Sequence, residues 1–209
     1  MVKFKVERYS DFLKITNSNG SLKMSVYLKN PDDSTGVIFE TPFCKFVTCR
    51  DLRDYDREIK EHKINPNFQY VEIGAGLGEF IPNLIDRYGS KLKYKPIVID
   101  PINYSLIRDI INFTLSLDLT KKVSGRLKII LMRCLIILDN NKVILINIDL
   151  EQAVKSKKIL NIADVLIDMA GAAHYMKNYK YAWKLERRIL KPNGILLATV
   201  IKSGIHYPS

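Results

Sequence analysis

Short apolar runs alternate with longer amphipathic stretches over the C-terminal two thirds of the chain. The runs are rich in Val, Ile and Leu, as the strands of a parallel sheet covered on both faces must be. They lie at residues 70–76, 96–101, 142–150, 163–171 and 194–202. Because strands that alternate with helices form βαβ units, this pattern predicts an α/β fold with a doubly wound, mostly parallel sheet.

The stretches between these runs show helix signals. Residues 78–89 have a helical pattern that ends at Gly89, and residues 177–194 have a helical pattern that is broken by Pro192 and Gly194. The segment from about 104 to 138 is too long for one crossover helix. We therefore predict that it is a helical insertion made of two helices, with Gly125 near their joint.

The N-terminal segment has a different pattern. Apolar and polar residues alternate over residues 12–30, on either side of an Asn-Gly pair that is typical of a β-hairpin. Residues 36–49 supply one or two further strand candidates, and the charged segment 50–63 begins with acids, as helices often do. We expect a β-rich segment with a charged helix over 1–66, followed by an α/β domain over 67–209.

Length and composition narrow the class of protein. The chain has 209 residues, 47% of them hydrophobic, which suffices for a buried core in one domain with appendages. Its N-terminus carries no apolar secretion signal. The most apolar window, residues 128–138, is interrupted by Arg133 and is shorter than the roughly 20 residues that span a membrane. We therefore expect a cytoplasmic protein with no membrane partner.

The three cysteines form no CxxC pair. Neither a disulfide framework nor a zinc site is indicated, and the odd number fits a reducing cytoplasm. Cys44, Cys49 and His62 are an alternative set of metal ligands, but ordinary packed or surface thiols are the simpler interpretation. We expect no metal.

The chain is basic. It has 33 Lys and Arg residues against 22 Asp and Glu residues, which leaves a formal net charge of +11. Such an excess favours polyanionic partners, for example RNA, through nonspecific attraction. The lysines are scattered rather than gathered in one block, so a solvated surface is the alternative interpretation.

The stretch "QYVEIGAGLGEF" places three glycines directly after a predicted buried strand. Glycines at Gly74, Gly76 and Gly78 would allow a sharp turn into a helix whose N-terminal N–H groups face a ligand. Glu79 stands where the dinucleotide fingerprint GxGxxG has its third glycine, and no GK[ST] sequence of a P-loop follows. Close packing of the helix on the sheet is the alternative use of these glycines.

"VEIGAGLGEF" resembles motif I of the class I S-adenosylmethionine-dependent methyltransferases, an acid and one further residue before GxGxG. The resemblance implies that S-adenosylmethionine is the cofactor. It also implies that Glu72 helps to hold the methionine portion of the cofactor. The loop of Gly74, Ala75, Gly76 and Gly78 would pass under it.

Further motifs of this family follow in the expected order. The resemblance implies that Asp100, 22 residues after Gly78, binds both ribose hydroxyls, with Pro101 beside it. It implies that Asp149 accepts a hydrogen bond from the adenine amino group and that the Leu150 N–H faces an adenine ring nitrogen. Asp100 as a helix cap, and Asp149 as the cap of the helix that follows it, are the alternatives.

The segment "ADVLIDMAG" resembles motif IV of the family, which lines the reactive methyl group. The resemblance implies that Asp168 faces this methyl group and contacts the cofactor. His174 or Tyr175 would contact the acceptor or act as the base, although a capping or packed histidine is the alternative. "ILKPNGILLAT" resembles the LKPGG connection before the fifth strand, so the resemblance covers about residues 68–202.

The predicted function is therefore transfer of a methyl group from S-adenosylmethionine to an unidentified acceptor, with RNA as one candidate. No NPPY or DPPY sequence follows the fourth strand, so we do not expect methylation of amino groups in DNA or on glutamine. Two alternatives stay open: an inactive cofactor-binding or regulatory module of the same fold, and an aminopropyltransferase-like enzyme.

Family members usually end in a β-hairpin after the fifth strand. We expect no such hairpin here, which would leave one edge of the sheet exposed. We predict that the N-terminal hairpin at residues 12–28, a partner, or a second copy of the chain covers this edge. The apolar sequence at 127–138 is expected to be buried or to form an oligomer contact.

Overall fold

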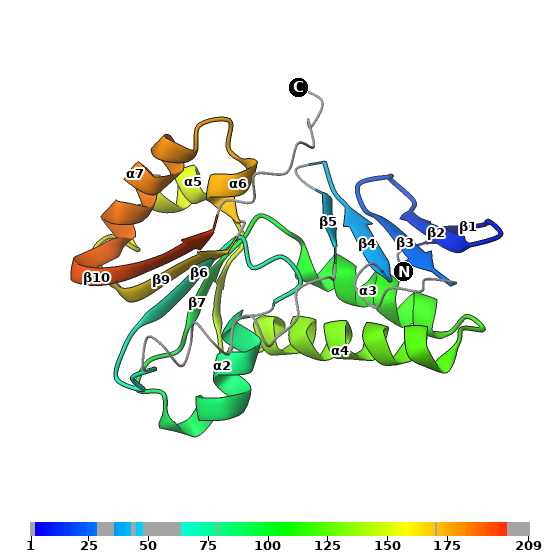
Figure 1. Ribbon diagram of the computed structural model, residues 1–209, viewed down its shortest axis with the longest axis horizontal. Helices are drawn as coiled ribbons and strands as arrows, with labels where there is room; N and C mark the ends of the chain where they lie inside the picture. Colours follow the sequence, from blue (N-terminus) through cyan, green and yellow to red (C-terminus); the bar gives the residue numbers. More distant parts are fainter. Residues whose placement is uncertain are drawn as a thin grey trace.

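The computed structural model describes residues 3–28, 36–42, 45–47, 64–78, 80–169 and 171–199, and it contains two β-sheets (Figure 1). The strands are β1 (Phe4–Arg8), β2 (Phe12–Asn17), β3 (Lys23–Tyr27), β4 (Val37–Glu40), β5 (Lys45–Val47), β6 (Tyr70–Ile73), β7 (Ile97–Ile99), β8 (Ile144–Ile146), β9 (Ala163–Met169) and β10 (Leu190–Thr199). The helices are α2 (Phe80–Tyr88), the short 3-10 helix η1 (Gly89–Lys91), α3 (Tyr104–Leu115), α4 (Lys121–Leu138), α5 (Leu150–Lys155), α6 (Ala172–Tyr175) and α7 (Tyr179–Ile189).

The sheet formed by β6 to β10 confirms the predicted α/β fold. Its strand order is β10-β9-β6-β7-β8, and all neighbouring strands in it run parallel. The chain starts in the centre at β6, moves outward to β8, and then returns to the other side at β9. This is the doubly wound, Rossmann-like order, and such sheets bind ligands at the carboxyl ends of the strands near the point where the direction reverses.

Helices cover both faces of this parallel sheet (Figure 1), with α5 and α7 on one side and α2, α3 and α4 on the other. The side chains of β6 alternate between the two layers, as the period of two in a strand requires. Val71 and Ile73 belong to the core under α5 and α7, whereas Tyr70 belongs to the core under α2 and α4. Burial on both faces explains why the strands are continuous apolar runs.

The predicted insertion lies between β7 and β8 and consists of two helices, but its joint differs from the prediction. The loop between α3 and α4 is at residues 116–120, and Gly125 lies inside α4. The Thr120 hydroxyl accepts a hydrogen bond from the Val123 N–H and caps the start of α4. Since this cap sets the helix start, the prediction that Gly125 lies near the joint was wrong.

The last helix ends before Pro192, as predicted, but the last strand begins earlier than predicted. Helix α7 ends at Ile189, and the chain enters β10 at Leu190, four residues before the predicted start at residue 194. Asn193 adopts a positive φ of 69°, and the register of β10 against β9 shifts between Leu190 and Ile195. The Lys-Pro-Asn-Gly sequence is therefore an irregularity at the start of the strand, not the end of the helix.

The N-terminal segment forms a five-stranded antiparallel sheet in the order β1-β2-β3-β4-β5. The predicted hairpin is confirmed, since β2 pairs with β3 across a turn in which Gly20 has a φ of 71°. The predicted helix at 50–63, and the alternative metal ligands Cys44, Cys49 and His62, lie outside the described residues. In the part of the chain that the structure describes, no cluster of His, Cys, Asp and Glu suits a metal ion.

The N-terminal sheet packs against the insertion helices and not against β10. Phe4 of β1 contacts Phe113 of α3 with ring centroids 5.0 Å apart, and the buried side chains of β2, β3 and β4 belong to one core with α3 and α4. Within the described residues, β10 pairs with β9 alone. The prediction that residues 12–28 cover the β10 edge was therefore wrong, and coverage by a partner or second copy stays a prediction.

The apolar helix α4 is buried on one side. Leu127, Ile130 and Ile137 are in the core, whereas Ile129 and Met132 are exposed. Burial of this segment was predicted and is confirmed for the inner side, while an oligomer contact over the outer side stays a prediction. None of the helices in the described ranges has the length and apolar character needed to span a bilayer.

Candidate functional site

The glycine turn connects β6 to α2 at the carboxyl end of the parallel sheet. Gly74 has a φ of 61° and Gly76 a φ of 59°, a left-handed conformation that residues with a Cβ rarely adopt. A Cβ on Gly74 would lie 2.6 Å from the Gly171 Cα, so the turn after β6 lies directly against the turn after β9. A Cβ on Gly76 would meet no atom within 4 Å, so the backbone there faces open space.

Glu72 lies in the middle of β6 and is buried, with an exposed fraction of 4%. Its Oε2 accepts a hydrogen bond from the Ile81 N–H at 3.0 Å, in the first turn of α2. A carboxylate at this place stabilises the helix N-terminus and holds α2 against the strand. The predicted contact of Glu72 with the methionine portion of the cofactor stays a prediction.

Asp100 follows β7 and has an exposed fraction of 1%. Its Oδ2 accepts hydrogen bonds from the Gly76 N–H at 3.1 Å and from the Tyr104 hydroxyl at 3.0 Å, while Oδ1 accepts from the Ile102 N–H at 2.8 Å. Burial raises the pKa of Asp100 to about 6, and these hydrogen bonds oppose the rise, so the carboxyl is mostly ionised at neutral pH. Asn103, not Asp100, caps α3, so the helix-cap alternative for Asp100 was wrong.

Asp149 precedes α5 and is exposed. Its Oδ1 accepts a hydrogen bond from the Gln152 N–H at 2.8 Å, which is the N-cap role given above as the alternative. Leu150, the first residue of α5, is buried. Contacts of Asp149 and Leu150 with adenine stay predictions.

A cavity of about 150 Å³ lies beside the carboxyl end of β7. Pro101 and Ile102 line it from the α/β side, and Leu22 and Pro42 line it from the N-terminal sheet. The N-terminal segment therefore forms a wall next to the predicted ribose acid, which no sequence pattern indicated.

Asp168, near the end of β9, is completely buried. Its Oδ1 accepts from the Gly171 N–H at 2.7 Å, and its Oδ2 accepts from the Ala173 N–H at 2.8 Å. These two hydrogen bonds hold the turn that contacts Gly74. The carboxylate thus organises this turn, and its predicted approach to a methyl group stays a prediction.

Glu186 of α7 is buried next to Asp168, and neither of its carboxyl oxygens receives a hydrogen bond. Burial, together with the neighbouring Asp168 carboxyl, raises the pKa of Glu186 to about 9. Glu186 is therefore protonated at neutral pH, and its proton can be donated to Asp168. When Asp168 and Glu186 share one proton, the pair buries one negative charge instead of two.

His174 and Tyr175 form the end of α6, directly beyond the turn that Asp168 holds. Their rings make an edge contact with centroids 4.9 Å apart. Tyr175 is exposed and His174 is partly buried. The fold thus brings both side chains to the end of the sheet that carries the glycine turn, about a hundred residues away in sequence.

Three residues of this site were missed by the sequence analysis. Asn147 donates from Nδ2 to the backbone oxygens of Asp100 and Ile102, at 2.8 and 2.6 Å, and so ties the end of β8 to that of β7. Tyr104 and Glu186 contact the two predicted acids. Tyr104 stands four residues after Asp100, a spacing that was available as a signal, whereas no local pattern distinguishes Glu186 from a surface acid.

No protein-family model matches this chain, and no curated protein matches it. Among solved structures, the chain is similar to the spermidine synthase from Thermotoga maritima, with 12% identity and a TM-score of 0.46. The similarity covers 90% of this chain and 53% of that protein, so this chain spans about half its length. The strand order of the parallel sheet shows the fold by itself.

Proposed function

We propose that this protein is an S-adenosylmethionine-dependent methyltransferase with its cofactor site over the carboxyl ends of β6, β7 and β8. The observation that carries this proposal is the position of Asp100. An ionised carboxylate with three hydrogen-bond donors around it lies against an open glycine turn, at the end of the sheet where doubly wound folds bind nucleotides.

The residues at this end of the sheet fit such a cofactor. The open backbone at Gly76 allows a ligand to approach the main chain, since a Cβ there would meet nothing. Asp100 can accept hydrogen bonds from two ribose hydroxyls, and Asp149 and Leu150 can face adenine beyond it. When bound, S-adenosylmethionine supplies an electrophilic methyl group on its sulfonium.

The acceptor side of the site would be formed by α6. Because the electrophile comes with the cofactor, the protein has to orient the acceptor and remove its proton where it carries one. His174 and Tyr175 are the side chains we assign to this task, with Asp168 holding the turn before them. The acceptor itself is not identified by these residues.

Calorimetric titration of S-adenosylmethionine into the wild type and into Asp100→Asn tests the cofactor site. We expect binding by the wild type and at least about tenfold weaker binding by the variant, because hydrogen bonds to a charged acceptor are lost. Asp164→Asn is the matched control. Asp164 lies at the opposite end of β9, where it accepts from Gln69 and Lys191 at 2.8 and 2.7 Å.

No binding to the folded wild type, or equal binding by Asp100→Asn, would contradict the proposal. Circular dichroism of each variant shows whether it is folded. Transfer of a radioactive methyl group to RNA, protein and small-molecule acceptors then separates an enzyme from a module that binds the cofactor without turnover.

A further inference from the structure

The outer side of α6 and α7 combines basic and aromatic side chains. Residues 171–199 contain a single acid, Glu186, and this acid is buried. We use the name α6–α7 face for the exposed basic residues and tyrosines of these helices and their connection. They are Tyr175, Lys177, Tyr179, Lys180, Tyr181, Lys184, Arg187 and Arg188.

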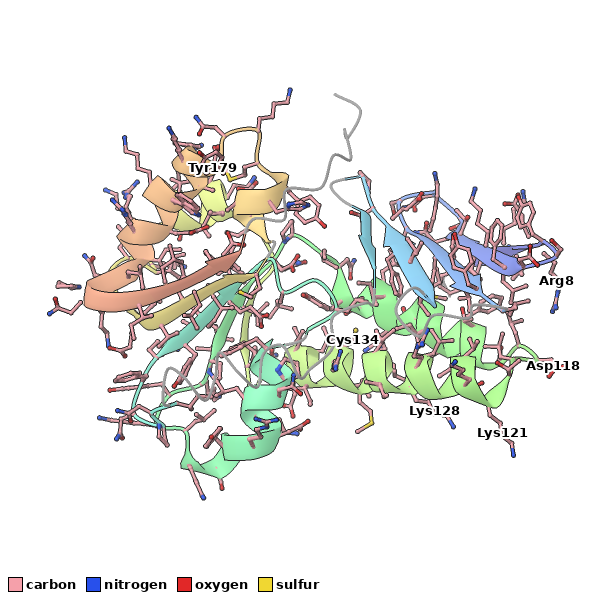
Figure 2. The ribbon with its side chains drawn as sticks, in the orientation of Figure 1. Arg8, Asp118, Lys121, Lys128, Cys134 and Tyr179 are labelled. Carbon is pink, nitrogen blue, oxygen red and sulfur yellow. The ribbon has the colours of Figure 1, made fainter. Side chains whose placement is uncertain are left out.

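The amphipathic pattern of α7 separates this face from the core. Ala182, Leu185, Glu186 and Ile189 are buried against the sheet, so all charges that remain on the outer side of α7 are positive. Figure 2 shows Tyr179 on this outer side, among side chains that end in nitrogen. No acid on α7 offsets the basic residues, and the face attracts anions.

The basic surface continues beyond α7. The Asn161 N–H donates to the Arg188 carbonyl at 2.9 Å, so the loop after α5 lies at the end of α7. This loop carries the exposed residues Lys157 and Lys158. At its other end the face begins at α6, next to the turn that contacts Gly74. Helix α7 has 11 residues and is about 16 Å long, so the face is a strip that leads to the candidate site.

The aromatic residues indicate which polyanion fits this strip. Tyr175, Tyr179 and Tyr181 are 37%, 42% and 39% exposed and lie between the basic residues. Alternating cations and aromatic rings suit single-stranded nucleic acid, since cations contact phosphates and rings stack on unpaired bases. A membrane surface would require apolar side chains that insert into lipid, and the large exposed apolar residues of this face are all tyrosines.

We propose that the α6–α7 face binds single-stranded nucleic acid. Lys180, Lys184 and Arg187 contact phosphates, and Tyr181 stacks on a base. The bound nucleic acid runs along α7 toward α6 and the glycine turn. Binding of the nucleic acid does not depend on the proposed function, whereas use of the nucleic acid as the methyl acceptor rests on that function.

Fluorescence anisotropy with a labelled twelve-nucleotide oligouridine tests this proposal on the full chain without S-adenosylmethionine. We expect Lys180→Gln/Lys184→Gln to weaken binding about tenfold or more at low salt. The slope of log affinity against log salt should become shallower by about 1.4, which corresponds to two phosphate contacts on a single strand. Lys121→Gln/Lys128→Gln on α4 removes the same charge from exposed lysines on the other side of the molecule (Figure 2) and should have little effect.

Tyr181→Leu separates base stacking from charge. It keeps an apolar side chain and all basic residues, so we expect oligouridine binding to fall at least about fivefold. Binding of heparin, a polyanion without bases, should not change. An equal loss for both ligands would overturn the stacking role of Tyr181.

Three results would overturn the proposal: no oligouridine binding by the folded wild type, equal weakening by the α4 control, or binding of phosphatidylserine vesicles that oligouridine does not displace. Cofactor titration on the same preparations keeps the two proposals apart. Lys180→Gln/Lys184→Gln should bind S-adenosylmethionine as the wild type does, so a loss of oligouridine binding alone concerns only the α6–α7 face.

Discussion

Two glycines lie against each other at the candidate site. Gly74 and Gly171 let the turns after β6 and β9 lie in contact, and a Cβ on Gly171 would clash with the backbone oxygen of Ile73 in β6. Gly74 can be recognised in the sequence because it belongs to a repeated glycine pattern. Gly171 cannot, because its need for a residue without Cβ depends on a strand about a hundred residues earlier.

The buried pair of Asp168 and Glu186 predicts a pH dependence of stability. The pKa of Glu186 is about 9 in the folded protein against an ordinary value of 4.5, so between these values the folded state holds a proton that the unfolded chain has lost. The stability from this group is complete below pH 4.5 and is lost as the pH rises toward about 9. The free energy of unfolding therefore falls as the pH rises through this range.

Glu186→Gln removes this titration, and its amide can still donate to Asp168. We expect the free energy of unfolding of the variant to exceed that of the wild type at pH 8, with a difference that grows between pH 6.5 and 8.5. Urea denaturation at several pH values measures it. Glu151→Gln on α5, which removes a partly exposed partner of Lys155, should show no such trend. A constant difference for Glu186→Gln would argue against a buried shared proton.

At the scale of elements, a capping residue sets the start of helix α4, although a glycine follows within the helix. Its start is set by Thr120, and Gly125 is exposed within it, with no atom within 4 Å of an added Cβ. Gly125→Ala should therefore raise the free energy of unfolding by about 0.5 to 1 kcal/mol, because alanine loses less backbone entropy in a helix. Urea denaturation is the measurement. A destabilised variant would contradict the position of Gly125 inside the helix.

The strands and helices of the parallel sheet were largely predictable, whereas their ends were not. Alternation of apolar runs and amphipathic stretches indicated all five strands, since burial on both faces leaves a continuous apolar run. The start of β10 lies four residues before the predicted residue 194, because Pro192 and Gly194 are compatible with an irregular strand as well as with a helix end. Asp149 was predicted both as a cap and as an adenine contact, and only the cap is visible in the structure.

At the scale of the whole molecule, the N-terminal sheet shares a core with α3 and α4. Phe39 of β4 is completely buried in this core. We expect Phe39→Ala to lower the free energy of unfolding by about 3 to 5 kcal/mol. The fluorescence of Trp183, the single tryptophan of the chain, reports on α7 at the far side of the parallel sheet. Its unfolding transition should shift together with that seen by circular dichroism, because the strands of the parallel sheet contribute side chains to both cores and couple their unfolding.

A tryptophan transition that stays in place while the circular dichroism transition shifts would contradict this prediction. It would show that the N-terminal sheet and the α/β part unfold separately. The predicted division at residue 66 would then describe two independent units, and the cavity between Pro42 and Pro101 would lie at their junction.

The sequence by itself determined the α/β fold, the N-terminal hairpin and the glycine turn, because each depends on residues that are close together in the chain. Periodicity, turn residues and the acid after β7 are local signals. Tertiary structure decided which acids are paired, which glycines touch and what packs on the N-terminal sheet. Asp168 meets Glu186, and Gly74 meets Gly171, only when β6, β9 and α7 have packed together. Contacts between distant segments are set by that packing, which leaves no periodic trace in the sequence.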